Sequence, residues 1–192
     1  MTGNNQLPKI NNRKQVAKSR LFTIEQLELT FSNGEERQYE RMLGAGYGAV
    51  MIVPMLDADT ILLVREYCAG THSYELGFPK GLIDAGEMPE QAANRELQEE
   101  ISYGAKQLQH LSQVMLAPAF FKAKMDIFIA SDLYPAQLEG DEPEPLDVVS
   151  WPIKEYKTLL KKPDFKEARS IAALMLLVDH LSPSKFAVQD DI

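Results

Sequence analysis

Residues 81–105 read GLIDAGEMPEQAANRELQEEISYGA, and their spacing decides the fold that we expect. Pro89 suits the first turn of a helix, where its missing backbone N–H costs little, so we expect a helix over residues 88–102. Apolar residues recur along this helix at four-residue spacing and form one side of it: Ala93, Leu97 and Ile101. The stretch therefore predicts a loop followed by a helix that packs one side on a core.

Three carboxylates fall within five residues of this helix: Glu96, Glu99 and Glu100. At about 100° per residue they occupy an arc of roughly 100° beside the apolar side. Like charges at this spacing repel one another unless they share a cation. Hard cations such as Mg²⁺ prefer oxygen ligands, often with phosphate oxygens completing the shell. An acidic helix face taken alone is commonly a solvated surface, so the flanking residues decide between the two interpretations.

The flanking residues match the Nudix box, which runs Gly, five residues, Glu, seven residues, Arg-Glu, an aliphatic residue, any residue, Glu-Glu, any residue, Gly and an aliphatic residue. Gly81, Glu87 and the run 95–100 resemble that pattern at seven of its nine defined positions. Ser102 replaces the second glycine, and Tyr103 fills the last position only loosely. Because the family glycine permits the conformation of the helix end, this turn is where the chain departs from the family.

The resemblance extends from about Leu21 to about Leu181. Over this range the sequence is similar to the small bacterial Nudix enzymes known as ADP-compounds hydrolases. It implies an α+β fold, an α/β/α sandwich with a mixed central sheet, and the order of strand and helix patterns favours the same class. We place the Nudix domain at residues 44–181, and Asp164 is the expected N-cap of its last helix.

A β-hairpin is expected as an N-terminal extension at residues 21–43. Residues 21–31 largely alternate apolar and polar side chains, and Asn33-Gly34 is a strong turn signal. In related ADP-ribose hydrolases an N-terminal β segment pairs with the partner subunit and helps to build its substrate site. Since two strands rarely stand unaided, we expect a homodimer that uses this hairpin as its dimerisation element.

The two ends of the chain match no family pattern. Residues 1–20 carry five basic residues and no acid, so we expect a basic, flexible arm there, and residues 182–192 are expected to form a C-terminal tail. Since that arm is +5, the remaining residues must carry −13 to give the net charge of −8. A body this acidic argues against nucleic acid as a partner, because phosphate backbones are bound by clustered Lys and Arg.

The composition also indicates the cellular compartment of the protein and argues against some classes of enzyme. No run of the sequence approaches the ~18 apolar residues of a membrane span, so we expect no membrane partner. The single cysteine, Cys68, suits a reducing cytoplasm, and we expect a cytoplasmic protein. The three histidines lack the HExxH spacing of a zinc hydrolase: His72, His110 and His180.

Nudix enzymes use Mg²⁺ or Mn²⁺ to hydrolyse a nucleoside diphosphate linked to another group. Two or three metal ions neutralise the phosphate oxygens and lower the pKa of a bound water. In this chain the resemblance implies that Glu87 and Arg95 form an ion pair that fixes the loop against the helix. It implies as metal ligands Glu96, Glu99, Glu100 and the carbonyl of Gly81.

The general base is left open among several carboxylates. In relatives that cleave ADP-ribose it lies on a mobile loop after the box, and the acidic loop 140–144 occupies that place here. Glu142 and Glu144 are the candidates on this loop. Glu99 or Glu100 is the alternative proton acceptor, and a solvated acidic turn is the alternative interpretation of the loop.

Residues that contact the substrate are expected on both sides of the box. Arg65, Glu75 and Lys80 lie just ahead of it, where relatives contact the nucleotide. Phe120 and Phe121 follow it, and an adenine ring can stack on an aromatic side chain. Packing in the core or under a lid is the alternative role for each of these residues.

The resemblance therefore implies a metal-dependent enzyme that hydrolyses the pyrophosphate bond of ADP-linked compounds and releases AMP and a phosphorylated group. ADP-ribose, NADH, FAD and diadenosine polyphosphates are the candidate substrates. One alternative is a Nudix hydrolase of nucleoside triphosphates, or chiefly of dinucleoside polyphosphates. The other is a Nudix fold kept as a ligand-binding module without turnover.

Overall fold

The structure, a computed structural model, describes residues 6–44 and 46–182. Contacts between residues divide the chain into two units. The first unit comprises the described residues up to Gly48 together with Met115–Lys124, and the second comprises the remaining described residues.

The second unit is built on a buried strand, β4 (Ala49–Pro54), whose apolar side chains are almost entirely shielded from solvent. From Met125 onward, β9 (Phe121–Pro135) pairs with β4 in parallel, while β7 (Lys80–Leu82) pairs with β4 antiparallel. A further strand, β8 (Tyr103–Ala117), also pairs with β9. The sheet is therefore mixed, as the resemblance implies.

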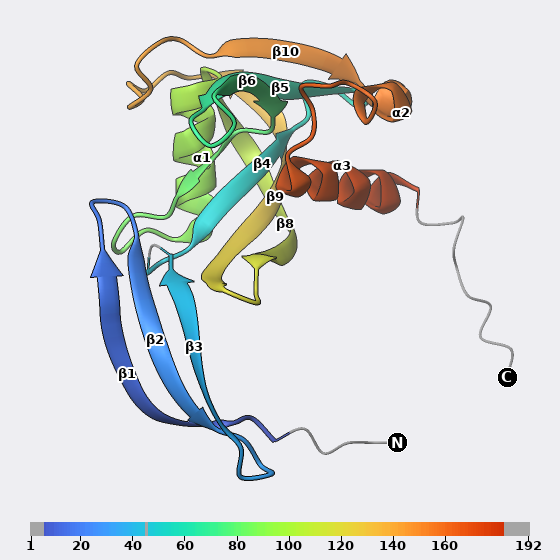
Figure 1. Ribbon diagram of the computed structural model, residues 1–192. Helices are drawn as coiled ribbons and strands as arrows, with labels where there is room; N and C mark the ends of the chain where they lie inside the picture. The colour runs from blue at the N-terminus through green and yellow to red at the C-terminus, as the bar shows by residue number, and fades with distance from the viewer. Residues whose placement is uncertain (1–5, 45, 183–192) are drawn as a thin grey trace, which may run out of the picture. The chain divides into compact units, whose positions relative to one another are not determined.

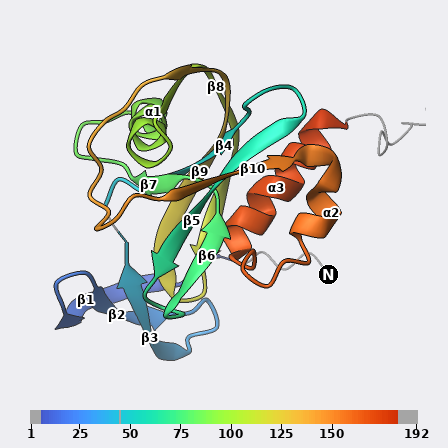
Figure 2. The same ribbon diagram turned by 90° about the horizontal axis from the view of Figure 1, so that it is seen from above.

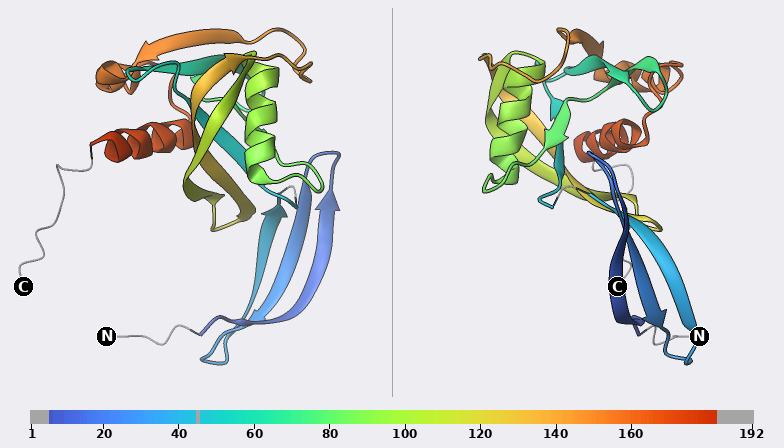
Figure 3. Two further views of the ribbon diagram at one scale, coloured as in Figure 1. Left: turned by 180° about the vertical axis from the view of Figure 1, so that it is seen from behind. Right: turned by 60° about the vertical axis from the view of Figure 1, so that its left-hand side comes forward.

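Helices cover both faces of this sheet (Figure 2). One of them, α1 (Pro89–Glu100), packs on β4 and β7, and its predicted apolar side is buried in the core with Val50, Ile52 and Phe128. On the opposite side, α3 (Ala168–Leu181) packs on β4 (Figure 3). This arrangement confirms the α+β class and the α/β/α sandwich. In the described part of the chain, no helix is both long and apolar enough to cross a membrane.

A smaller antiparallel sheet completes the second unit. Its central strand is β5 (Thr60–Cys68), which pairs with β10 (Asp147–Pro152) and with β6 (Ser73–Gly77). After β10 the chain continues through a 3-10 turn at Ile153–Glu155 into the short α2 (Tyr156–Leu159). The order of this sheet places the ends of β5 and β6 beside the loop that precedes β10.

The first unit contains three antiparallel strands (Figure 1): β1 (Lys9–Lys18), β2 (Thr23–Thr30) and β3 (Glu36–Leu43). The predicted hairpin forms between β2 and β3, and Gly34 in its turn has φ +84°, where a side chain would be strained. In addition, β3 pairs in parallel with the first residues of β9, where Met42 lies opposite Phe121.

Strand β1 corrects the expectation of a flexible arm at residues 1–20. Lys9–Lys18 pairs with β2 along its length, while residues 1–5 lie outside the described part of the chain. All ten residues of β1 are exposed, so backbone hydrogen bonds to β2 hold this strand in place. The strand was not predicted because its sequence lacks the alternation of apolar and polar residues. Apart from Ser182, the predicted tail at 182–192 also lies outside the described residues.

The last helix begins later than predicted. Glu167 rather than Asp164 caps α3, because its carboxylate accepts hydrogen bonds from the backbone N–H groups of Arg169 (3.1 Å) and Ser170 (2.8 Å). Asp164 instead pairs with the guanidinium of Arg65 at 2.5 Å. Asp164, which the local pattern predicted as the helix cap, therefore forms a long-range ion pair instead.

Candidate active site

Strand β7 lies against α1 and brings the backbone of Gly81 to the side chain of Glu96. A Cβ atom at position 81 would overlap the Glu96 carboxylate, so only glycine permits this approach. The helix starts at Pro89, and its first turn is fixed by a hydrogen bond of 2.9 Å from the Met88 N–H to the Gln91 side chain. Local sequence thus positions the start of the carboxylate-bearing helix.

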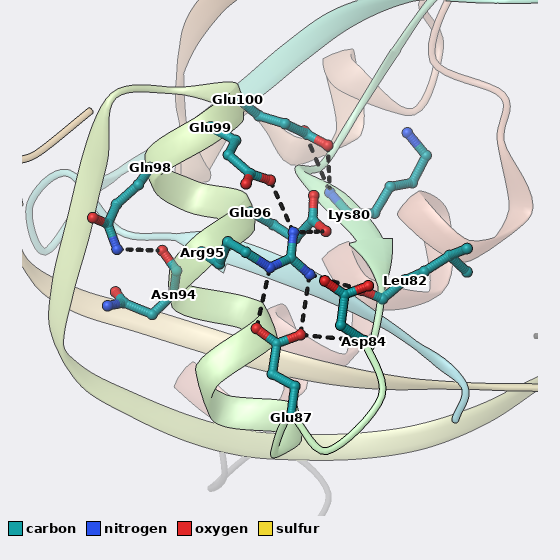
Figure 4. A network of polar contacts seen from close by, with 10 residues as sticks. All are labelled: Lys80, Leu82, Asp84, Glu87, Asn94, Arg95, Glu96, Gln98, Glu99 and Glu100. Atoms are coloured by element: carbon teal, nitrogen blue, oxygen red, sulfur yellow. Dashed lines mark hydrogen bonds and ion pairs between the residues drawn. The ribbon is translucent and has the colours of Figure 1, made fainter. Parts of the chain in front are cut away.

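Arg95 ties the loop before α1 to the helix (Figure 4). Its Nε and Nη2 atoms each donate to one carboxylate oxygen of Glu87 at 3.1 Å, and Nη2 also donates to the Leu82 carbonyl at 2.8 Å. This contact with Arg95 holds the pKa of Glu87 below its usual range. The ion pair that the resemblance implies is therefore present.

The same guanidinium also lies between two of the three box carboxylates, which the sequence did not predict. Nη1 of Arg95 donates to Glu96 at 2.7 Å and to Glu99 at 2.9 Å. The hydrogen bonds to Glu87 and then to Glu96 raise the pKa of Arg95, so it remains a cation at any ordinary pH. One positive charge is shared among three carboxylates, which leaves the cluster negative.

Burial makes two of the box carboxylates poor acids. Glu96 and Glu100 are each 7% exposed, and burial raises the pKa of Glu96 to about 7 and that of Glu100 to about 9. The Glu100 carboxylate accepts the Lys80 N–H at 3.3 Å, which is a long hydrogen bond. A nearby cation would restore the ionised form of both groups, and hard divalent cations favour such oxygen donors.

The donor chemistry therefore fits a divalent metal ion, although the side chains do not converge on a single point. Within residues 6–44 and 46–182, no three acidic, His or Cys side chains are placed to hold a metal ion together. Arg95 lies between Glu96 and Glu99 and contacts both. To share a metal ion, these two carboxylates would have to turn away from the guanidinium.

A cavity of about 680 Å³ opens beside these side chains, which is a typical size for a small-molecule site. On one side it is lined by Gly81 and the three box carboxylates, and on the other by residues 139–142, which include the first part of the acidic loop. Two backbone hydrogen bonds of 3.2 Å hold the residues before this loop to α1 and to the turn that follows it: the Leu138 N–H donates to the Gln98 carbonyl, and the Ala136 N–H donates to the Ser102 carbonyl. The loop is thereby kept beside the helix.

The two candidate bases on this loop lie differently. Glu142 lines the cavity, as a base would have to, and its carboxylate folds back over Gly140. Glu144 accepts a hydrogen bond from the hydroxyl of Tyr74 and lines neighbouring hollows instead. The structure therefore separates two residues that the sequence left equivalent.

Two of the residues expected to contact substrate lie at or near the cavity. Lys80 lines it and forms an ion pair with Glu66, a lining residue that sequence reasoning missed. Glu66 follows the apolar run ILLV and Arg65 in β5, so the sequence could have placed it near the end of a buried strand. No motif indicated that it pairs with Lys80. Arg65 lines a smaller neighbouring pocket, and its guanidinium pairs with Asp164 and, at 3.5 Å, with Asp147.

The other three residues expected to contact substrate do not line this cavity. Glu75 is buried in β6, where it accepts a hydrogen bond from Ser73 at 2.7 Å. Phe120 is exposed, Phe121 begins β9, and both belong to the first unit. The cavity also has acidic lining that no motif predicted: Asp84, Glu139 and Asp141.

Ser102 stands in the position of the second box glycine and adopts φ +59°. This is the left-handed conformation that glycine adopts without strain and that other residues visit at a cost. The chain therefore keeps the backbone of the box and accepts the strain of a serine there.

Family models match nearly the whole described chain. A NUDIX domain model matches residues 47–174, and a model of the NudE-type Nudix hydrolase N-terminal domain matches residues 8–41. This chain is a member of the Nudix hydrolase family. The N-terminal match begins within the segment expected to be an arm and includes all of β1. Nudix hydrolases generally need divalent metal ions, which agrees with the donor chemistry of the cavity.

Full-length relatives agree with this assignment. The ADP compounds hydrolase NudE of Escherichia coli K12 is 54% identical over 176 residues, which cover 92% of this chain and 94% of that protein. The ADP-ribose pyrophosphatase of Bacillus subtilis is 25% identical over 85% of this chain and 91% of that protein. A crystal structure of an ADP compounds hydrolase superposes with a TM-score of 0.88 at 53% identity, covering 94% of this Nudix chain and 97% of that one.

Proposed function

We propose that this Nudix hydrolase cleaves the pyrophosphate bond of ADP-linked compounds and releases AMP and a phosphorylated group. ADP-ribose, NADH, FAD and diadenosine polyphosphates are the substrates to test. The observation that carries the proposal is the single cavity lined by all three box carboxylates, Lys80 and the acidic loop. The relatives named for ADP compounds and ADP-ribose support the same substrate class.

Mg²⁺ or Mn²⁺ would be held by Glu96, Glu99, Glu100 and the Gly81 carbonyl. When bound, such an ion offsets the charge of the phosphate oxygens and makes water a better nucleophile. Arg95 keeps the loop and helix together through Glu87, so the backbone near Gly81 stays beside the helix that carries the three carboxylates. Lys80 brings a positive charge to the cavity wall, but Glu66 pairs with it, so the bound metal ions rather than Lys80 would offset most of the charge of the pyrophosphate.

We assign the general base to Glu142, which lines the cavity from the acidic loop. In this role its carboxylate takes the proton from the attacking water, and the loop backbone, hydrogen-bonded to α1, orients it. Glu144 serves the loop differently, because its carboxylate accepts the Tyr74 hydroxyl.

The test is a substrate panel scored by product identity, run with Mg²⁺ or Mn²⁺. We expect AMP and ribose 5-phosphate from ADP-ribose, and a loss of kcat of about 10²-fold or more in Glu99→Gln. The melting curve of this variant in metal-free buffer should barely move, because a single ion pair between partly exposed groups contributes little. The matched control is Glu90→Gln, an exposed glutamate of the same helix, which should keep full activity.

Two results would contradict the proposal. Release of inorganic pyrophosphate from a nucleoside triphosphate as the main activity would assign the chain to a different Nudix reaction. No turnover of any ADP-linked compound with either metal would favour a ligand-binding module instead.

We further propose that the protein is a homodimer assembled through its first unit and that it works in the cytoplasm. Several large apolar side chains of this unit are exposed, among them Leu21 (68%) and Phe22 (52%). Exposed apolar surface of this kind favours a protein partner. The cytoplasmic location is supported by the single free thiol, Cys68, which suits a reducing compartment.

A further inference from the structure

A second, smaller pocket of about 260 Å³ adjoins the acid-lined cavity, because Glu66 and Glu142 line both. We call it the tyrosine pocket. Its lining includes Tyr67 of β5, Tyr74 of β6, and residues 142–147, a segment that contains Pro143 and Pro145. Aromatic and proline side chains offer flat apolar surfaces, which set this pocket apart from its acidic neighbour.

The two tyrosine rings are exposed and held in place. Tyr67 is 44% exposed and Tyr74 is 51% exposed, and their ring centroids lie 5.9 Å apart at an interplanar angle of 66°. The Tyr67 hydroxyl lies 2.9 Å from Nδ1 of His72, and the Tyr74 hydroxyl donates to Glu144. Because both hydroxyls have partners, binding against these rings loses little side-chain freedom.

The charges around the tyrosine pocket exclude a phosphate group. Acidic side chains line it, and Asp147 and Asp164 engage the guanidinium of Arg65. An anion would be repelled, whereas a flat ring with N–H donors on its edge finds carboxylate acceptors. A cavity of about 150 Å³ already accepts benzene, so this pocket has room for one planar heterocycle but not for a whole nucleotide.

We propose that the tyrosine pocket binds the planar ring at one end of an ADP-linked substrate, while the pyrophosphate lies in the acid-lined cavity. The ligand class is a nitrogen heterocycle with an amino or amide donor, such as adenine. This inference rests on the proposed function and extends it to a second part of the same site. Stacking on Tyr74 and Tyr67 supplies affinity, and the carboxylates select the donor edge of the ring.

The test compares AMP with ribose 5-phosphate, which carries a hydroxyl group at C1 where AMP carries the adenine ring. The dissociation constant of each is measured by calorimetry in the presence of Mg²⁺, for the wild type, Tyr74→Leu and Tyr67→Leu. We expect wild-type protein to bind AMP about tenfold or more tightly than ribose 5-phosphate, as one stacked base provides. Each leucine variant should lose most of that difference and leave the affinity for ribose 5-phosphate within about twofold.

Two controls separate stacking from other effects. Tyr74→Phe keeps the ring but loses the hydroxyl contact to Glu144, so it should lose some AMP affinity and clearly less than Tyr74→Leu loses. Tyr156→Leu removes a tyrosine of α2 that lines neither pocket and should change nothing. Because both pocket tyrosines are about half exposed, the melting temperatures of all variants should stay close to that of the wild type.

The outcomes distinguish this inference from the proposed function. If the wild type hydrolyses ADP-ribose but the leucine variants bind AMP as tightly as it does, the tyrosine pocket is not the ring site and the proposed function stands. If the wild type hydrolyses no ADP-linked compound, the proposed function fails, and selective loss of AMP affinity in the variants would still locate a ring-binding site.

Discussion

The two glycine positions of the box make different demands on a residue. At position 81 the demand is steric, since any side chain would overlap the carboxylate of Glu96. At position 102 the demand is conformational, since φ is +59° and the residue is exposed. An exposed position has space for a side chain, so a serine can stand at 102 at a cost in strain, whereas a side chain at 81 would force the Glu96 carboxylate to move.

Ser102→Gly should therefore stabilise the protein. Glycine adopts positive φ freely, while a residue with a Cβ atom is strained there by ~1 kcal/mol, and glycine gives back part of that gain through a more flexible unfolded chain. We expect the free energy of unfolding in urea to rise by about 0.5 kcal/mol. Ser102→Ala keeps the Cβ atom and should show no such gain. An equal or lower stability of the glycine variant would show that the serine side chain supports the turn.

At the scale of an element, the cap of α3 links stability to pH. Burial alone would raise the pKa of Glu167, but hydrogen bonds from Arg169 and from the first turn of α3 hold it below the ordinary value of 4.5. Since the folded-state pKa is the lower one, this carboxylate stabilises the fold fully above the unfolded-state pKa. The contribution is lost as the pH falls through the folded-state pKa.

Glu167→Gln should accordingly lower the free energy of unfolding by about 1 kcal/mol at pH 7, a usual value for a helix cap. The difference between wild type and variant should shrink as the pH is lowered below about 5. Urea titrations at a series of pH values measure it. Glu155→Gln, at an exposed acid before α2, is the control and should show little effect at any pH. A difference that stays constant down to pH 3 would mean that charge at Glu167 is not what caps the helix.

The acidic loop offers a matched pair of variants at the same scale. Glu142 lines the cavity, whereas Glu144 accepts the Tyr74 hydroxyl. We expect Glu142→Gln to lower kcat for ADP-ribose by about 10²-fold or more, the usual contribution of a general base, and Glu144→Gln to lower it less than about tenfold. Steady-state kinetics under saturating Mg²⁺ decides. The reverse order would move the base to Glu144, and two small effects would move it to Glu99 or Glu100 on α1.

Features set by short-range sequence were predictable. The apolar side of α1, the Glu87–Arg95 pair and the hairpin turn at Gly34 each depend on residues within one element and its adjoining loop. They follow from helical periodicity, from the box and from turn chemistry. The family resemblance supplied the α/β/α sandwich and the mixed central sheet.

Features set by long-range contacts were not predictable from the pattern alone. Strand β1 is held by backbone pairing with β2 and carries no apolar alternation. Asp164 was assigned to a cap by local logic but pairs with Arg65, 99 residues away. The Tyr74–Glu144 contact joins residues 70 positions apart. In each case the partner comes from another part of the fold, which no window along the sequence contains.

At the scale of the whole molecule, the two units differ in how they are stabilised. Most of the buried apolar side chains belong to the second unit, with cores on both sides of β4. In the described part of the first unit, Leu27 and Leu29 are the buried apolar residues of the three-stranded sheet, at 8% exposure each. A small sheet is stable only when its apolar face is covered by other parts of a protein. Because so few of its apolar side chains are buried, we expect this unit to bind a protein partner.

The homodimer proposal makes a direct prediction about mass. One chain is 21.6 kDa, so light scattering at micromolar concentration should give about 43 kDa, twice that value. Leu21→Glu combined with Phe22→Glu places charge on two exposed apolar positions of the first unit and should shift the protein toward the monomer, because burying unpaired charge in an interface is unfavourable. Met175→Glu changes an exposed apolar residue of α3 in the second unit and should leave the dimer intact. A monomeric wild type would contradict the proposal, and dissociation caused by Met175→Glu alone would place the interface on α3 instead.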